Sequence, residues 1–332
     1  MRWVILTDDF GPMPSGVATW TAAAADALAD AGDDVAVFAR RRTDFGASES
    51  YRVRGVGGPS FGRFGGAWTA LAAHSAIRRA DAVLASTWPV AIHAVAMRRR
   101  PGAPFHVVFH GSDITRPPIH PRGLARVLRR ATHRWAVSRF LADLVEPDCG
   151  VLPAPVDIAM TTAEPGGRWG MVARATPLKG GERFVNIVAA AGARGLIVGD
   201  GPALPRWKQA ADRVGADIRF TGALSHKQTL AHIAGLEVML LLPRTHDDGS
   251  GAEGAGLVLL EAASLGIACV GCRVGGVPEA LGPGLLLADP DDATASAEQI
   301  RVWLSADRGR NARAWLAANH GKARLADALR DS

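Results

Sequence analysis

The sequence predicts an α/β fold of two doubly wound, Rossmann-like domains that face a ligand-binding cleft. Short apolar runs alternate with Ala-rich helical stretches along the whole chain of 332 residues. Near-continuous apolar strands separated by helices indicate parallel sheets that are covered on both faces. This alternation occurs twice in series, and the length suits two domains of about 150 residues each.

The first half contains apolar runs with the length and composition of buried strands. Ala-rich stretches at 17–32 and 67–79 have the pattern of helices. The strands expected here are residues 3–7, 34–39, 82–87, 106–110 and 134–138.

The second half repeats this rhythm and ends in stretches that we expect to be two closing helices, 290–304 and 308–330. The strands expected here are residues 168–174, 195–199, 217–222, 237–243, 267–272 and 284–289. The segment VLPAPVDI, with two prolines, is the expected joint. We therefore expect domains at 1–152 and 153–307, and a C-terminal helix at 308–332 that packs back toward the first domain.

Composition limits the cellular location that we expect. No stretch approaches the roughly 20 apolar residues that span a bilayer, and MRWVILTDDF is typical of a buried strand rather than of a signal peptide. Cys149, Cys269 and Cys272 fit a reducing compartment. The Cys-x-x-Cys pair lies in an apolar run with no second Cys/His pair nearby, which favours a strand over a zinc site. These features predict a cytoplasmic protein.

The positive charge is unevenly distributed. Residues 1–150 hold 19 of the 38 Lys and Arg but only 13 of the 32 Asp and Glu, so the whole net charge of +6 lies there. The clusters are Arg40–Arg42, Arg98–Arg100, and Arg122, Arg126, Arg129 and Arg130. A basic face attracts phosphates, anionic lipid or nucleic acid, whereas the alternative is a solvated, arginine-rich surface.

The run EGAGLVLLEAASLG carries the strongest chemical signal. Gly254 and Gly256 let the backbone approach a ligand, and a helix that begins near Leu257 offers free N–H groups to a phosphate. Glu261, one turn into that helix, has the acceptors for two neighbouring hydroxyls, as in a ribose. Glu253 lies in the loop before the helix, where its carboxylate suits sugar hydroxyls.

Other candidate residues follow predicted strands, where open parallel sheets bind ligands. Arg174 and Lys179, in ARATPLKGG, carry the charge that neutralises a diphosphate leaving group. Gly199 lies in the tight turn VGDGP, and His110 ends the strand of FHGSD. Gly16 opens the first long helix, where it is free to approach a phosphate. Each of these signals alone also fits an ordinary turn, a solvated pair or a structural histidine.

Taken together, the motifs resemble those of the retaining family-4 glycosyltransferases of GT-B fold. Each motif is weak, but their order and spacing match the family along nearly the whole chain. They stand at Ser15-Gly16, His110-Gly111, Val137-Ser138, Pro153 to Asp157, Arg174 to Gly180, Gly199 to Pro202, Glu253 to Glu261, and Gly275 to Glu279.

The resemblance implies retaining transfer of a hexose from a GDP- or UDP-linked donor to an acceptor hydroxyl, without a metal and without a cofactor. It places the donor on the second domain and the acceptor on the first. The implied catalytic residues are His110, Arg174, Lys179 and Glu253. The implied donor-binding residues are Gly16, Arg174, Lys179, Gly199, Gly254, Ala255, Gly256, Leu257 and Glu261. Two departures from the family are a short first domain and the small Ala255, which widens the expected sugar pocket.

The acceptor stays open at this stage. The run LPRTHDDGSGAEGAGLVLLEA also resembles the actinobacterial phosphatidylinositol mannosyltransferases. With the basic first half, this favours a lipid-linked acceptor and peripheral contact with an anionic membrane at its inner face. A small molecule or a glycan is the alternative acceptor, and no nucleic-acid partner is expected.

Other functional classes fit parts of the sequence. A dinucleotide-dependent oxidoreductase shares the fold class, but the sequence after Gly201 places Leu204 where a GxGxxG motif needs glycine. A nucleotide-sugar-binding or epimerase-like protein acting on a soluble metabolite, or a lipid-binding module, is the other alternative. Asp289-Pro290-Asp291 is interpreted as a helix cap rather than a metal-binding DxD. His246, Asp247 and Asp248 have side chains of the kind that bind metals, but the sequence offers no matching ligands to complete a metal site.

Overall fold

A computed structural model gives the structure of the chain in two compact units. It describes residues 1–10, 15–40, 50–56, 65–111, 113–115, 120–157, 166–246, 251–305 and 307–332. The first unit comprises Met1–Pro155 and His320–Ser332, and the second comprises Val156–Asn319.

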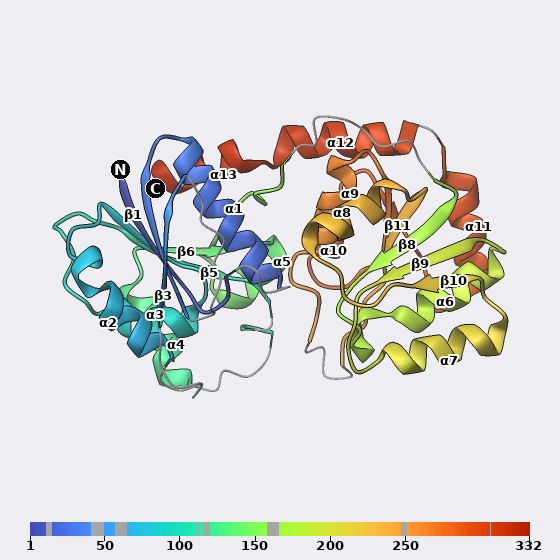
Figure 1. The fold of residues 1–332 in the computed structure, drawn as a ribbon, viewed down its shortest axis with the longest axis horizontal. Helices are drawn as coiled ribbons and strands as arrows, with labels where there is room; N and C mark the ends of the chain where they lie inside the picture. Colours follow the sequence, from blue (N-terminus) through green and yellow to red (C-terminus); the bar gives the residue numbers. More distant parts are fainter. Residues whose placement is uncertain are drawn as a thin grey trace. The chain divides into compact units, whose positions relative to one another are not determined.

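The described part of the first unit contains a seven-stranded parallel sheet in the order β3-β2-β1-β4-β5-β6-β7 (Figure 1). Its strands are β1 (Arg2–Thr7), β2 (Asp34–Arg40), β3 (Arg52–Val56), β4 (Ala82–Ala85), β5 (Phe105–Phe109), β6 (His133–Ala136) and β7 (Gly150–Val151). β1 pairs with β2 on one side and with β4 on the other. The strand order therefore reverses between β1 and β4, and sheets of this kind bind ligands at that point.

Helices cover both faces of this sheet. They are α1 (Gly16–Asp30), α2 (Gly65–Ile77), α3 (Trp88–Ala94), α4 (Pro121–Arg130), α5 (Arg139–Val145) and α13 (Lys322–Arg330). The N-cap of α1 is Ser15, whose side chain accepts from the backbone N–H of Ala18, and the alanines of α1 favour the helix. Val4 and Leu6 face a core with α2 to α5, whereas Trp3 and Ile5 face one with α1 and α13.

The described part of the second unit contains a six-stranded parallel sheet in the order β10-β9-β8-β11-β12-β13. Its strands are β8 (Arg168–Val172), β9 (Arg194–Val198), β10 (Ile218–Phe220), β11 (Val238–Leu241), β12 (Ala268–Gly271) and β13 (Leu285–Leu286). Here the strand order reverses between β8 and β11. This pattern repeats that of the first sheet, as the two-fold rhythm of the sequence predicts.

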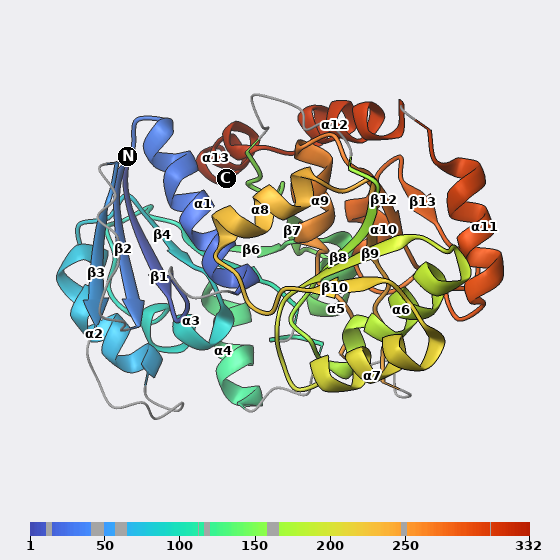
Figure 2. The same ribbon diagram turned by 45° about the vertical axis from the view of Figure 1, so that its right-hand side comes forward.

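Helices α6 and α7 lie on one face of this sheet, and α8 and α9 lie on the other (Figure 2). The helices of the unit are α6 (Gly181–Ala190), α7 (Leu204–Val214), α8 (His226–Ala234), α9 (Leu257–Ser264), α10 (Val277–Leu281), α11 (Ala293–Trp303) and α12 (Asp307–Asn319), with a 3-10 turn, η1, at Pro177–Lys179. Phe184, Trp207 and Ile300 fill the core between α6, α7 and α11.

The structure confirms the fold class and corrects parts of the predicted organisation. The expected single helix at 308–330 is interrupted at His320 and Gly321, where Gly321 has a φ of 117°. Its first part, α12, belongs to the second unit, and α13 packs on α1 in the first. The units divide at Pro155, three residues later than the expected boundary. The edge strands β3 and β7 were missed because neither is a long apolar run.

Candidate active site

The candidate donor-binding residues of the second unit gather at the carboxyl edge of its sheet. The Thr176–Gly180 turn follows β8, and the loop that ends in Glu253 follows β11. β8 and β11 are the neighbouring strands at which the order of the sheet reverses. The two motifs that the sequence singled out separately therefore leave the sheet at the same point.

Lys179 and Glu253 form an ion pair at this edge. The Lys179 ammonium donates to Glu253 Oε2, although the residues lie 74 positions apart in the chain. The Glu253 side chain is 15% exposed and that of Lys179 is 31% exposed, so the pair is partly shielded from water. A partly buried ammonium beside a carboxylate that accepts hydrogen bonds suits a ligand that combines negative charge with hydroxyl groups.

The N-terminus of α9 lies directly after this pair. Gly256 is the N-cap, with φ of 60°, a left-handed conformation that glycine adopts without steric cost. Among the described residues no side chain caps the helix, and its first turn contains no acidic residue. The N–H groups of Leu257 and Val258 and the positive end of the helix dipole thus suit an anion, whereas the N–H of Leu259 donates to the Gly256 carbonyl. Leu257 is the first helical residue, as the sequence predicts.

Glu261 has a partner that sequence reasoning missed. His226, the first residue of α8, lies with its Nε2 3.0 Å from Glu261 Oε1. The hydrogen bond to Glu261 raises the pKa of His226, and burial opposes it. Ser225 fixes the start of α8 through a capping box with Gln228. This helix start was identifiable from Ser-x-x-Gln, but the contact with α9 was not.

Arg174 and Gly199 occupy different environments at the same edge. Arg174 follows β8 with an exposed side chain, which makes no ion pair with the described residues. Gly199 follows β9, and a Cβ there would lie 2.0 Å from the carbonyl oxygen of Ala173. Its backbone N–H donates to the carbonyl of Gly222. Close packing of two turns thus accounts for Gly199 without a ligand, and its donor contact stays a prediction.

His110 belongs to the first unit, directly after β5. Its ring meets that of Trp20 edge-on, with the centroids 5.0 Å apart. Burial lowers the pKa of His110 to about 4, against the effect of a hydrogen bond to the backbone of Ser86. At neutral pH the ring is therefore uncharged. Its buried Nε2 atom has no hydrogen-bond partner within the described structure.

Buried polar atoms without a partner concentrate near His110. Asp113 accepts from the backbone N–H groups of His110 and Gly111, and burial raises its pKa. Asp8, after β1, also has its pKa raised by burial. The unpartnered atoms of this region, within the described residues, are Asp8 Oδ1, Trp20 Nε1, Thr87 Oγ1, His110 Nε2, Asp113 Oδ2 and Thr115 Oγ1. Each buried group of this kind calls for an explanation, and a bound water, a ligand or a catalytic role is one.

Gly16 is the first residue of α1, behind the N-cap Ser15. Ser15 Oγ donates to Asp9 Oδ2 at 3.1 Å, which ties the start of α1 to the carboxyl end of β1. The rest of the Gly16 loop lies outside the described residues. Gly16 and His110 thus lie in the first unit, whereas the other candidate residues lie in the second.

The acidic motifs have other roles than the expected ones. The cap of α11 is Asp292, which accepts from Ala295, rather than Asp289 or Asp291. Asp291 instead pairs with Arg183 and Arg244. No group of three metal-ligating side chains occurs among the described residues, which exclude Asp247 and Asp248. Cys269 and Cys272 are buried free thiols.

Two family models match consecutive parts of the chain. The model described as Glycosyltransferase Family 4 matches residues 14–159, and the model described as Glycosyl transferases group 1 matches residues 168–306. Each covers most of one unit: the first range contains Gly16 and His110, and the second contains the candidate donor-binding residues from Arg174 to Glu261. The chain belongs to glycosyltransferase family 4. It is thus an enzyme of the glycosyltransferase class by family, and its fold is GT-B.

Curated relatives match part of this family-4 chain. It is 34% identical over 120 residues, 36% of the chain, to N-acetyl-alpha-D-glucosaminyl L-malate synthase of Bacillus anthracis. It is 30% identical over 125 residues, again 36% of the chain, to a GDP-mannose-dependent monoacylated alpha-(1-6)-phosphatidylinositol monomannoside mannosyltransferase of Corynebacterium glutamicum. The matches span 30% and 33% of these relatives, so about a third of their length.

Solved structures resemble this family-4 chain over its whole length. Anabaena HepE in complex with UDP and glucose has a TM-score of 0.73 at 19% identity, with 98% of both chains covered. Sucrose-phosphate synthase from Thermosynechococcus elongatus has a TM-score of 0.79 at 17% identity, with 100% of this chain and 98% of that chain covered. At these identities the likeness concerns the fold.

Proposed function

We propose that the chain is a retaining, metal-independent glycosyltransferase that takes a hexose from a GDP- or UDP-linked donor. The observation that carries the proposal is the Lys179–Glu253 ion pair next to the N-terminus of α9, which no described side chain caps. A cation and a helix N-terminus together suit a diphosphate, and Glu253 suits the hydroxyls of the attached sugar. Glu261 suits the ribose, and His226 orients its carboxylate.

The proposed reaction is a front-side displacement on the donor. The bond between the anomeric carbon and the diphosphate oxygen breaks, while the acceptor oxygen bonds to the same face of that carbon. Arg174, Lys179 and the α9 N-terminus stabilise the charge on the departing diphosphate. A phosphate oxygen of the leaving group takes the proton of the acceptor hydroxyl, so no protein base is needed. Uncharged His110 is proposed to contact the transferred sugar.

A panel of nucleotide sugars tests the donor assignment. A bound donor raises the melting temperature, because it stabilises the folded state by mass action. GDP- and UDP-linked hexoses are compared with nicotinamide dinucleotides, and Lys179→Ala is the matched variant that loses the proposed diphosphate contact. Stabilisation by nicotinamide dinucleotides alone contradicts the proposal. Product NMR then tests retention, because the anomeric configuration of the donor must persist. Binding without transfer or donor hydrolysis favours the sugar-nucleotide-binding alternative.

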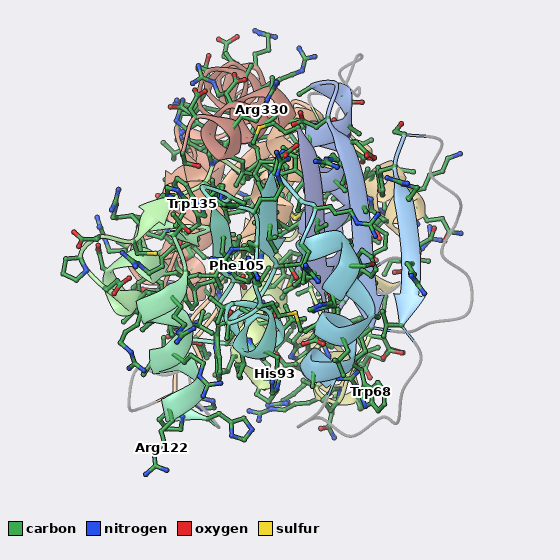
Figure 3. All side chains as sticks on the ribbon, turned by 90° about the vertical axis from the view of Figure 1, so that its left-hand side faces the viewer. Trp68, His93, Phe105, Arg122, Trp135 and Arg330 are labelled. Atoms are coloured by element: carbon green, nitrogen blue, oxygen red, sulfur yellow. The ribbon has the colours of Figure 1, made fainter. Side chains whose placement is uncertain are left out.

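We further propose that the acceptor is lipid-linked and that the first unit contacts an anionic membrane. The exposed arginines of α4 support this proposal, and so do two exposed apolar side chains of α2, Trp68 and Leu71. Helix α3 packs between α2 and α4, and Figure 3 shows Trp68 and Arg122 at the lower edge of one face with His93 between them. Basic and interfacial apolar residues together favour a lipid surface. No described helix is long and apolar enough to cross a membrane.

A further inference from the structure

A cluster of three charged side chains lies beside the proposed donor site without belonging to it. Arg183, in α6, forms a two-pronged ion pair with Asp291, its Nε 3.0 Å from Oδ1 and its Nη2 2.6 Å from Oδ2. Arg244, after β11, pairs with the same carboxylate. The hydrogen bond from Arg183 is the main cause that lowers the pKa of Asp291. The carboxylate therefore stays charged at neutral pH.

Arg183 also binds the backbone that leaves β11. Its Nη1 donates to the carbonyl of Pro243 at 2.6 Å and, more weakly, to that of Leu242 at 3.4 Å. The Arg183 side chain is only 11% exposed, so these contacts are mostly shielded from water. A planar guanidinium forms such a fork with little loss of freedom, whereas lysine cannot form it. Arg183 thus links the start of α6, the end of β11 and the segment before α11.

The segment after β11 is held to the Thr176–Gly180 turn near its start. The backbone N–H of Arg244 donates to the carbonyl of Leu178 at 2.7 Å. Gly180 approaches so closely that a Cβ there would lie 1.8 Å from the carbonyl oxygen of Leu242. The start of the segment is therefore in direct contact with the turn that carries Lys179.

The end of the same segment is held to the same turn by Lys179 itself. Lys179 donates to the Glu253 side chain, and the Glu253 carbonyl accepts from the backbone N–H of Gly276 at 2.9 Å. Three residues beyond Glu253 lies Gly256, the cap of α9. Lys179 thus lies on a turn whose neighbouring residues, Leu178 and Gly180, contact the backbone on either side of Pro243, the residue whose carbonyl Arg183 binds.

We infer that Arg183 and Asp291 are positioning residues for the donor, which fix the start of the β11–α9 segment so that Lys179 and Glu253 stay together. This inference rests on the proposed function. Neither residue needs to touch the donor. Misplacing a binding group by about 1 Å can cost about 100-fold in rate, so loss of the clasp formed by Arg183 and Asp291 is expected to impair use of the donor.

The test measures donor and acceptor kinetics of Arg183→Ala, Arg183→Lys and Asp291→Asn with GDP- and UDP-hexoses. The donor KM is expected to rise about tenfold or more in Arg183→Ala and Asp291→Asn, while the acceptor KM stays unchanged. Arg183→Lys should raise the donor KM less than Arg183→Ala does but should not restore the wild-type value. The reason is that an ammonium cannot form the planar fork by which a guanidinium binds the Asp291 carboxylate and the Pro243 carbonyl together. The rise in donor KM in the double variant Arg183→Ala/Asp291→Asn should be smaller than the two single effects combined, since the two residues share one ion pair.

Arg206→Ala is the matched control. Arg206 pairs with Glu182, the neighbour of Arg183 on α6, but its side chain is 67% exposed. The substitution Arg206→Ala should therefore leave the donor KM unchanged. A purely structural role of the clasp predicts instead a lower melting temperature with an unchanged donor KM, and that result overturns the inference. If the wild-type protein shows neither donor stabilisation nor transfer, the proposed function itself fails. If it shows both and Arg183→Ala behaves as Arg206→Ala does, only this inference fails.

Discussion

Lys179 donates a hydrogen bond to Glu253 from a turn that lies 74 positions earlier in the chain. The two residues come from separate motifs, one rich in basic residues and one rich in glycine. They meet because their loops leave the two strands, β8 and β11, at which the order of the sheet reverses. In the absence of donor, the carboxylate offsets the charge of the ammonium. A diphosphate sugar offers both groups new partners.

Loss of either cation should slow the reaction. Arg174→Ala and Lys179→Ala are each expected to lower kcat by about 100-fold or more, the cost of removing one preorganised charge donor. Lys179→Ala should also leave Glu253 without its partner, whereas Arg174 has no ion pair to lose within the described residues. Steady-state kinetics with saturating donor check this. Unchanged kcat in both variants would exclude a leaving-group role, and Lys208→Ala on α7 is the control.

The ribose contact gives a second prediction. Glu261→Gln should weaken binding of the nucleoside diphosphate, because a neutral amide accepts a hydrogen bond less strongly than a carboxylate does. The loss should be much smaller with a 2′,3′-dideoxy nucleotide, which lacks the hydroxyls that Glu261 is proposed to bind. Calorimetric titration of both nucleotides against both proteins measures the coupling. Equal losses with the two nucleotides would place Glu261 away from the ribose.

The rate should not depend on a divalent metal. The charge of the leaving group is assigned to Arg174, Lys179 and the α9 N-terminus, and Asp291 is engaged by two arginines. Excess EDTA is therefore expected to leave kcat and KM essentially unchanged in the initial-rate assay. Complete loss of activity that Mn²⁺ or Mg²⁺ restores would contradict the assignment of the leaving-group charge to the protein.

Sequence reasoning located the strands other than the edge strands β3 and β7, because buried parallel strands are apolar along their whole length, as in β4 and β11, whose residues are all buried. It also predicted the start of α9 correctly, whereas the donor-binding roles of Lys179 and Glu253 stay predictions. It could not find the contacts of Glu261 with His226 or of Asp291 with Arg183. These join positions 35 and 108 residues apart, and local patterning carries no signal for such pairs.

The buried histidine of β5 should make the protein sensitive to acid. His106 is fully buried, stacks on His133, and accepts from Trp135 Nε1 through its Nδ1. Burial lowers the pKa of His106 to about 3. The unfolded chain therefore binds more protons than the folded one between the ordinary histidine pKa of about 6.5 and this value. Stability is thus fully retained above about pH 6.5 and falls as the pH drops below it.

His106→Asn should weaken this dependence, because asparagine keeps an acceptor for Trp135 but does not titrate. The free energy of unfolding should fall less steeply with pH, by up to about 1.4 kcal/mol per pH unit for one proton. Urea unfolding at several pH values between 7 and 4 measures the slope. The exposed His74, replaced in the same way, is the control. An unchanged slope in His106→Asn would mean that His106 does not carry the acid sensitivity.

Membrane contact is the last prediction, and it depends on the α2–α4 face of the first unit. The protein should sediment with anionic vesicles, more strongly as their anionic lipid content rises and less strongly as salt is added. Arg126→Glu with Arg129→Glu should weaken binding, since each arginine near the surface contributes about 1 kcal/mol. Trp68→Ser should weaken it without changing the salt dependence, because it removes apolar contact and no charge.

Arg206→Glu with Arg213→Glu, on α7 of the second unit, is the control, because it alters the net charge equally and should have little effect on vesicle binding. If the two double Arg→Glu variants lose vesicle binding equally, the binding depends on net charge rather than on the α2–α4 face. If the wild-type protein does not sediment with anionic vesicles at low salt, the membrane proposal is wrong and a soluble acceptor is favoured.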